Sequence, residues 1–195
     1  MVDRKRCAWV ADNALYQTYH DTEWGVPCRD DRSLFELLIL EGAQAGLSWI
    51  TILKKRDNYR RLFDNFDAKK IALYKPKKLD RILQDPGIVR NRLKVESTVT
   101  NARAFLELQK EAGGFSGFVW SFVGGEPIKN NPLSLKDVPS STAESDALSK
   151  ALKKRGFKFV GTTICYAFMQ AAGLVDDHTV DCFRHRALVK KRVRK

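Results

Sequence analysis

Hydrophobic residues recur at helical spacing through most of the chain. Leu34, Leu37 and Leu38 continue to Glu41 with the i, i+3, i+4, i+7 spacing of a single helical face. Ser33 directly precedes this run, and Glu36 lies three residues after Ser33, which is the pattern of a capping box. A helix is therefore predicted from about residue 34, with Glu41 on its apolar side.

The same spacing predicts helices over much of the remaining chain. They cover residues 49–66, as one helix or as two with a break near Asp57, and then 71–74, 79–83, 95–108 and 160–172. Another helix is predicted to run to Lys154 from a cap at Ser141 or Thr142. A last helix is predicted to start at Asp176 or Asp177 and to carry His178 and Cys182. The alternating pattern of strands is nearly absent, and residues 158–162 show it best. The expected fold class is all-α.

The chain is strongly basic. Lys and Arg number 35 against 23 acidic residues, which gives a net charge of +12. The last twelve residues (184–195) supply seven positive charges and no negative one, so the rest of the chain still carries +5. A basic surface indicates a polyanionic partner, and nucleic acid is the commonest. For residues 184–195 the alternative is a solvated tail that only aids solubility.

Several classes of protein are excluded by composition. No run approaches the roughly 18 apolar residues of a membrane span. The charged start, Met1 to Cys7, lacks the apolar stretch of a signal peptide. These features predict a cytoplasmic protein that does not bind membranes. Four scattered cysteines are too few for a disulfide scaffold, so metal ligation or simple burial is expected for them.

One segment resembles a DNA-binding hairpin. LDRILQDPGIVRNRLKVES has a short helix, a turn at Pro86 and Gly87, and a second helix. In a helix-hairpin-helix, backbone N–H groups of the turn face a DNA phosphate and nearby cations assist. Candidates here are Gly87, Arg90, Arg92 and Lys94. Many such hairpins have a second glycine where this chain has a valine, so an ordinary helix-helix turn is the alternative.

A carboxylate and a group of aromatic residues form a second constellation. Glu41 lies on an apolar helix face, where an acid is rare unless something there uses it. Rings stack on a planar cationic ligand while a carboxylate accepts its N–H protons. A structural ion pair is the alternative for the acid, and core packing for each ring. The candidate rings are Trp9, Tyr16, Tyr19, Trp24 and Trp49.

Four residues could ligate a metal. Cys7 and His20 lie near the start of the chain, and His178 and Cys182 lie near its end. Two cysteines and two histidines are typical of a closed structural zinc site. Their spacing differs from that of the standard zinc finger, so buried cysteines and incidental histidines are the alternative. A zinc ion here would tie the N-terminal segment to the C-terminal one.

Long blocks of the chain resemble type I 3-methyladenine DNA glycosylases. The resemblance runs from about Cys7 to Cys182, and it is most specific in CAWVADNALYQTYHDTEWGVP, LFELLILEGAQAGLSWITILKKRDNYR and SDALSKALKKRGFKFVGTTICYAFMQAAGLVDDH. It implies a helix-hairpin-helix glycosylase fold with one structural zinc per chain. The residues that match the family's zinc ligands are Cys7, His20, His178 and Cys182.

The resemblance also implies roles for the other candidates. Glu41 matches the base-recognition carboxylate, while Gly46 and Leu47 match a loop that fills the gap left by a flipped nucleotide. The basic tail matches no family feature. The pocket aromatics of the family fall on Trp9, Tyr16, Tyr19, Trp24 and Trp49.

The resemblance implies hydrolysis of the N-glycosidic bond of 3-methyladenine in double-stranded DNA. A stacked base must be flipped into a pocket before it is cut. Methylation at N3 makes the base cationic and labile, so little acid assistance is needed. No aspartate lies between Gly87 and Phe115 to stabilise a sugar cation, and no lysine stands where a Schiff base would form. We therefore expect a monofunctional enzyme that leaves an abasic site and binds free 3-methyladenine as product.

Two other classes of function stay open on the sequence alone. The chain could be a non-catalytic helix-hairpin-helix DNA-binding protein, or a zinc-stabilised scaffold that binds proteins. No long flexible linker divides the chain, so residues 1–195 are expected to form one compact monomeric domain. Its expected parts are a hairpin lobe over about 33–120, a zinc lobe from 1–32 and about 140–183, and the tail 184–195.

Overall fold

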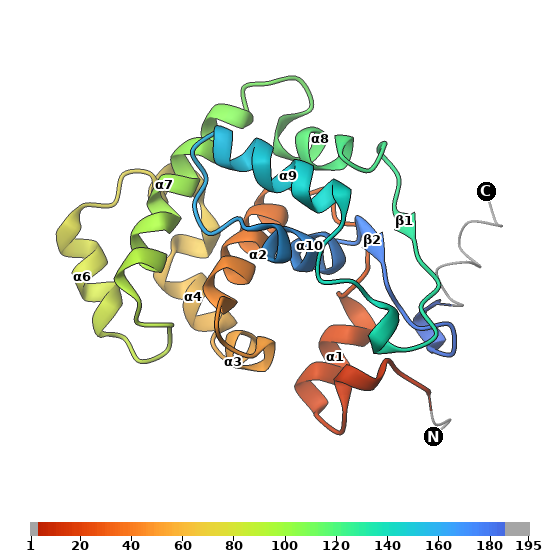
Figure 1. The fold of residues 1–195 in the computed structure, drawn as a ribbon. Coiled ribbons are helices and arrows are strands. Elements are labelled where there is room, and N and C mark those ends of the chain that lie inside the picture. The colour runs from red at the N-terminus through yellow and green to blue at the C-terminus, as the bar shows by residue number, and fades with distance from the viewer. Residues whose placement is uncertain (1–3, 186–195) are drawn as a thin grey trace.

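Helices make up most of residues 4–185, the part of the chain that the computed structural model describes (Figure 1). This confirms the predicted fold class. The α-helices are α1 (Ala14–Thr22), α2 (Asp31–Gln44), α3 (Trp49–Leu53), α4 (Arg56–Leu62), α5 (Ala68–Ile71), α6 (Pro76–Gln84), α7 (Arg92–Leu108), α8 (Gly114–Ser121), α9 (Ala143–Lys154) and α10 (Thr162–Ala171). Short 3₁₀ helices are η1 (Ala8–Val10), η2 (Asp64–Phe66) and η3 (Leu135–Asp137). None of the described helices is both long and apolar enough to cross a membrane.

Helix α2 lies at the centre of the fold, with α10 beside it and α7 across it (Figure 1). Its buried positions run from Leu34 to Ala43 with the exception of Glu36, because apolar residues occupy most of its faces. Phe35 packs on Phe105 of α7, with ring centroids 4.7 Å apart, and Phe105 packs in turn on Phe115 of α8. Burying such rings is the main favourable contribution to folding. These contacts fix α2, the helix that carries Glu41, in the core.

The start of α2 differs from the predicted capping box. Asp30, and not Ser33, is the N-cap: its carboxylate accepts hydrogen bonds from the Ser33 backbone N–H and hydroxyl, both at 2.8 Å. Asp and Ser cap helices about equally well, so the residue pattern could not rank them. Helix α9 begins at the second of its two predicted caps, because Thr142, and not Ser141, accepts the Ser145 N–H.

The predicted last helix over residues 176–182 is wrong. Residues Val175–Asp176 instead form strand β2, which pairs in parallel with β1 (Ile128–Lys129). The main-chain carbonyls of Leu174 and Asp176 accept hydrogen bonds from Ile128 and Asn130, at 2.9 and 3.1 Å. These carbonyls are therefore unavailable for helical hydrogen bonds, and the chain continues in turns. Residues 158–162 are not a strand.

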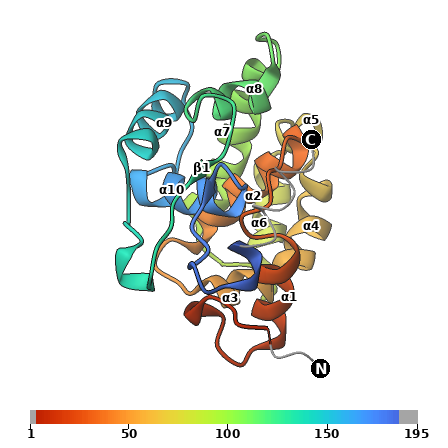
Figure 2. The same ribbon diagram turned by 90° about the vertical axis from the view of Figure 1, so that its right-hand side faces the viewer.

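The two ends of the described chain meet beside α1. The Phe183 N–H donates to the Lys5 carbonyl at 2.9 Å, and Lys5 also forms an ion pair with Asp181. Figure 2 shows the segment after β2 lying directly against the N-terminal segment and α1. This arrangement brings the four candidate metal ligands to one region.

Candidate active site and metal centre

A cavity of about 300 Å³ lies between α1, the α2–α3 connection, α10 and η3. That volume lies at the lower end of the range of small-ligand pockets. Five of the residues singled out from the sequence line it: Trp9, Tyr19, Trp24, Glu41 and Trp49. The fold adds others that the sequence did not indicate as pocket residues, namely Gln44, Leu135, Val138, Ala167, Gln170 and Asp177.

The Glu41 carboxylate is buried in this cavity without a partner. Its residue is 4% exposed, and no hydrogen bond or ion pair to its carboxylate occurs within residues 4–185. Burial raises the pKa of Glu41 to about 8, because a low-dielectric environment disfavours the charged form. An acid held this way is costly to the fold and fits a ligand that supplies the missing donors.

Aromatic rings form the wall next to this acid. The Trp9 and Trp24 rings lie 5.2 Å apart, and the Tyr19 and Trp49 rings lie 5.6 Å apart. The indole N–H groups of Trp9 and Trp49 are buried with no hydrogen-bond partner among the described residues. Burial and the nearby Glu41 raise the pKa of Tyr19, so its hydroxyl stays protonated. The cavity thus offers flat aromatic faces beside the unpaired Glu41 carboxylate, as suits a planar heterocycle.

Tyr16 lies outside the residues that line the cavity. Its hydroxyl accepts a hydrogen bond from the Ile50 backbone N–H at 2.9 Å, and its ring meets Trp9 edge-on, with ring centroids 5.4 Å apart. The Ile50 N–H belongs to the first turn of α3, where helical N–H groups lack a partner within the helix. Tyr16 therefore joins α1 to α3 and supports the position of the Trp9 ring.

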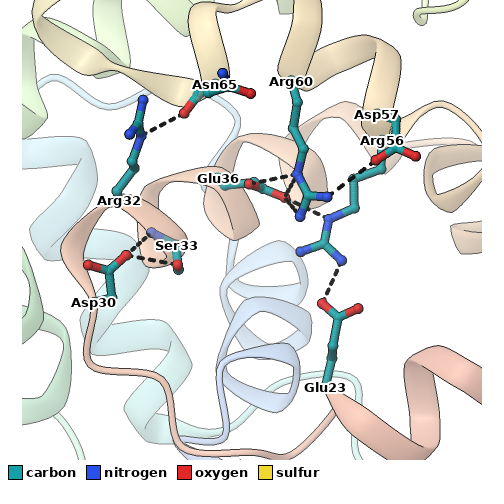
Figure 3. Close-up of polar contacts among 9 residues, drawn as sticks. All are labelled: Glu23, Asp30, Arg32, Ser33, Glu36, Arg56, Asp57, Arg60 and Asn65. Atoms are coloured by element: carbon teal, nitrogen blue, oxygen red, sulfur yellow. Dashed lines mark hydrogen bonds and ion pairs between the residues drawn. The ribbon is translucent and has the colours of Figure 1, made fainter.

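An ion-pair network connects the end of α1 with α2 and α4 (Figure 3). The Arg56 guanidinium donates to Glu23, just after α1, at 2.5 Å and to Glu36 of α2 at 2.6 Å. Arg60 reaches Glu36 as well, at 2.8 Å. Glu36 and Arg56 are largely buried, so solvent screens these pairs less than surface pairs. The network links α1, α2 and α4, and no pattern in the sequence indicates it.

Three of the four candidate metal ligands converge in one buried cluster. The ligand atoms of Cys7, His20 and Cys182 all lie within 4.8 Å of one another. The His20 ring places Nε2 3.4 Å from the Cys182 sulfur, and its Nδ1 lies 2.8 Å from an Asp21 carboxylate oxygen. A carboxylate on the second ring nitrogen is the usual support of a histidine that ligates a metal. The prediction that these chain ends share a site is confirmed to this extent.

His178 lies beside this cluster with one ring nitrogen unpaired. Its ring centroid is 5.0 Å from that of His20, and its Nδ1 lies 2.9 Å from Asp176. Its Nε2 is buried without a hydrogen-bond partner in the described part of the chain. At Gly25, φ is +73° and an added Cβ would lie 2.6 Å from the His178 ring, so only glycine leaves the ring its space. His178 does not lie on a helix with Cys182, contrary to the prediction.

The sulfur atoms also have the surroundings of metal ligands. The Cys7 sulfur lies 3.5 Å from the Thr179 backbone nitrogen and 3.7 Å from its hydroxyl, and both groups donate to it. The hydrogen bond between Cys7 and Cys182 lowers the pKa of Cys182 and raises that of Cys7, as in a pair that shares one proton. Buried thiols and imidazoles supported in this way fit a metal ion.

The pocket rings pack directly on the imidazoles of this cluster. Trp24 lies 4.6 Å from the His178 ring, and Trp9 lies 5.5 Å from the His20 ring, measured between centroids. The cavity and the metal cluster therefore share a wall. A change in one will shift the other, because close-packed interiors transmit displacements of side chains.

The candidate DNA contacts lie on exposed turns. Gly46 has φ +79° and open space around it, and Leu47 is 42% exposed, in the turn between α2 and α3. Gln44 and Trp49, on either side of this turn, both line the cavity. The turn therefore stands next to the pocket, as a loop that probes DNA requires.

The α6–α7 turn has a different set of contacts. The Gly87 N–H donates to Asp85 at 2.7 Å, and Arg92 forms ion pairs with Asp80 and Glu96, at 2.9 and 3.4 Å. Arg90 is exposed and makes no hydrogen bond or ion pair with residues 4–185. Of the candidate cations in this turn, only Arg90 is thus without a protein partner in that range.

The ammonium group of Lys94 makes hydrogen bonds within the protein. Its ammonium group donates to the carbonyls of Ala43 and Ala45, at 2.8 and 2.7 Å. These carbonyls lie at the C-terminal end of α2, where helical carbonyls lack intrahelical partners and a cation is favourable. Lys94 therefore holds the end of the helix that carries Glu41. The candidate tail continues to residue 195, and residues 186–195 lie outside the described part.

Comparisons with known proteins agree on one family. The family described as methyladenine glycosylase matches residues 9–185. DNA-3-methyladenine glycosylase 1 of Escherichia coli (strain K12) is 56% identical over 178 residues, which cover 91% of this chain and 95% of the relative. A crystal structure of 3-methyladenine DNA glycosylase I has a TM-score of 0.90 at 56% identity, covering 92% and 98% of the two chains. A variant of 3-methyladenine DNA glycosylase I in complex with 3-methyladenine has a TM-score of 0.88 at 39% identity, covering 91% and 96%.

Proposed function

This chain belongs to the methyladenine glycosylase family, and we propose that Glu41 recognises the base that the enzyme removes. It is a DNA-3-methyladenine glycosylase, which excises 3-methyladenine from DNA. The observation that carries the proposal is the buried, unpartnered Glu41 carboxylate beside four aromatic rings. A methylated adenine supplies N–H donors for the acid and a flat cationic ring for the aromatic wall.

The proposed reaction is a monofunctional hydrolysis. The flipped nucleotide places its base in the cavity, and water attacks C1′ to leave an abasic site. Among residues 4–185 no lysine lines the cavity, so none of them is available there to form a Schiff base. Trp9, Tyr19, Trp24 and Trp49 hold the base, while Tyr16 supports the position of Trp9 and α3. Free 3-methyladenine binds the same cavity as product.

We propose that the metal is one structural zinc ion, with His178 as fourth ligand beside Cys7, His20 and Cys182. Two thiolates and two imidazoles suit tetrahedral zinc and leave no open position for catalysis. When bound, the ion would supply a fixed link between the chain ends. The residues themselves already place Trp9 and Trp24 against the two imidazoles.

The proposed DNA contacts surround the pocket. Gly46 and Leu47 enter the space left by the flipped nucleotide, while Gly87, Arg90 and Arg92 face phosphates. The exposed, unpaired Arg90 supports this most directly. We further propose a monomer in the cytoplasm, built as one domain with the hairpin lobe over about 33–120 and the zinc lobe from 1–32 and about 140–183.

A direct assay tests this function. Duplex DNA carrying 3-methyladenine should lose the free base and gain abasic sites when the protein is added, without strand cleavage before alkali treatment. Liquid chromatography measures the released base, and gel electrophoresis measures the abasic sites. A non-catalytic DNA-binding protein would bind this duplex and release nothing, and that outcome would contradict the proposal.

A second prediction concerns the basic tail. If residues 184–195 contact phosphates, deleting them should weaken binding to all sequences alike, because backbone charge carries no sequence information. The slope of log affinity against log salt should become shallower by about 0.9 for each phosphate that the tail neutralises. Fluorescence anisotropy over a salt series measures both. An unchanged slope would show that the tail serves solubility or another partner.

A further inference from the structure

A second carboxylate lines the active-site cavity from a different part of the chain. Asp177 follows β2 directly and is 2% exposed, yet it belongs to the cavity wall together with Glu41. The sequence pattern indicated this residue only as the cap of a helix that does not form. The fold brings it to the pocket because β2 pairs with β1 and runs along the end of α10.

Three hydrogen-bond donors fix this carboxylate. The Tyr166 hydroxyl and the Gln170 side-chain amide donate to Oδ2 at 2.6 and 2.7 Å, and the Asn130 side-chain amide donates to Oδ1 at 2.7 Å. An ionised carboxylate only accepts hydrogen bonds, so three donors match its charged form. Burial and the hydrogen bond to Asp177 raise the pKa of Tyr166, which keeps this hydroxyl a donor.

No positive charge compensates Asp177 within the described residues. All three of its partners are neutral, and no lysine, arginine or histidine forms an ion pair with it in residues 4–185. A buried charge without a counter-ion costs several kcal/mol on an order-of-magnitude basis unless something else compensates it. The carboxylate of the neighbouring Asp176, in contrast, forms a hydrogen bond with Nδ1 of the His178 ring. Asp177 lines the same cavity as Glu41, so a ligand that enters this cavity can meet its uncompensated charge.

We propose that Asp177 supplies the standing negative charge that stabilises the sugar cation formed when the glycosidic bond breaks. The inference rests on the proposed function. The C1′–N9 bond breaks with its electron pair going to N9, which makes the methylated base neutral and leaves C1′ cationic. Water then adds to C1′ and releases a proton to solvent. A carboxylate already ionised and oriented favours this charge transfer without reorganising during the reaction.

The two carboxylates of the pocket thus have different tasks. Glu41 has no donor in the described structure and can accept those of the base, whereas Asp177 has its donors built in. The first serves recognition of the base, and the second serves the charge that appears after the base departs. Selectivity and rate can therefore be separated by mutation.

The first test removes the charge of Asp177 and keeps its shape. Asp177→Asn should slow single-turnover excision by roughly tenfold to hundredfold. It should also reduce the preference for duplex DNA containing a protonated pyrrolidine abasic analogue over DNA with the neutral tetrahydrofuran analogue. Tyr166→Phe removes one donor and leaves the charge, so it should retain most of that preference. A purely structural role would weaken binding to both duplexes equally.

A second pair of variants leaves Asp177 itself intact. Gln170→Lys places an ammonium group where the amide meets Oδ2, which neutralises the carboxylate, while Gln170→Met removes the same hydrogen bond without adding charge. The lysine variant should lose the preference for the charged duplex, and the methionine variant should retain it. Zinc content, measured in each variant, shows whether the adjacent His178 still holds its place.

The outcomes separate this inference from the proposed function. A wild-type protein that does not excise 3-methyladenine contradicts the proposed function. Wild-type excision together with an unchanged duplex preference in Asp177→Asn contradicts only the role of Asp177. If Asp177→Asn does not fold, the same criterion applies to Gln170→Lys against Gln170→Met, and equal preferences in that pair overturn the inference.

Discussion

Replacing Cys182 by alanine should remove the metal and lower the melting temperature by about 10 °C or more. Structural zinc supplies on the order of 10–16 kcal/mol of apparent binding energy, and loss of even 3–5 kcal/mol shifts the melting of a chain of this size by about that much. Cys182 is fully buried, and its sulfur lies 3.4 Å from His20 Nε2. Its loss therefore opens the link between the chain ends. Elemental analysis and thermal unfolding measure the two effects.

A matched control is present in the same chain. Cys165 is as deeply buried as Cys182, but its sulfur contacts the Val160 carbonyl and belongs to no group of metal ligands among residues 4–185. Cys165→Ala should keep one zinc per chain and cost only the small destabilisation of a minor cavity, about 1 kcal/mol. Wild-type protein purified without added metal that holds well under one zinc per chain would refute the metal assignment. Equal melting temperatures for the two variants would refute its structural role.

Loss of the metal should also change the orientation of the aromatic rings in the pocket. Trp24 and Trp9 pack on the imidazoles of His178 and His20, with ring centroids 4.6 and 5.5 Å apart. When those imidazoles lose a common partner, the two tryptophans lose the surface that orients them. With the proposed His178 as fourth ligand the site would be structural, since it would provide no open coordination position. Its effect on base recognition follows from the shared wall.

The helical elements could be predicted because their information is local. The apolar stripe from Leu34 to Glu41 and the cap at Thr142 are both visible within a few residues, and the structure confirms both helices. Residues 175–176 show the limit of such patterns. Their strand depends on pairing with residues 128–129, and nothing near Asp176 in the sequence records that partner.

The same division holds for the pocket. Glu41 was noticeable because an acid interrupts an apolar helix face, and the rings near it were noticeable through their density in the first segment. Gln170 and Asp177 carried no such signal, because polar residues near a chain end are ordinary. Only the fold places them against α2 and α3 in one cavity. Residue types predicted the recognition of a cation, while tertiary structure was needed to show a second carboxylate.

The raised pKa of Glu41 gives a pH signature that links stability and binding. Its ordinary value of 4.5 applies when the chain is unfolded, and burial raises it to about 8 in the folded protein. Between these values the folded state holds a proton that the unfolded state has released. This group's contribution to stability therefore falls as pH rises from about 4.5 to about 8. Thermal unfolding over pH 5–8 should show a steeper decline for wild type than for Glu41→Gln.

Glu41→Gln should reduce affinity for free 3-methyladenine by roughly tenfold to hundredfold, since a charge-assisted hydrogen bond in a closed site contributes about 1.5–3 kcal/mol. Glutamine keeps the shape of the side chain, so fold and zinc content should be unchanged. A ligand that offers N–H donors favours ionised Glu41, and wild type should therefore release up to about one proton on binding near pH 7. The variant should release none. Calorimetry in two buffers of different ionisation enthalpy measures affinity and proton release together.

The excision rate gives the complementary result for the same variant. The methylated base is already cationic and labile, so excision by Glu41→Gln should fall less steeply than its affinity for the free base. Affinity for undamaged DNA should stay at the wild-type value, because Glu41 lies inside the cavity and the candidate phosphate contacts lie on exposed turns. Wild-type affinity, activity and proton release in the variant would together show that Glu41 is only a buried structural acid. The pocket would then recognise its base through the aromatic rings and without this acid.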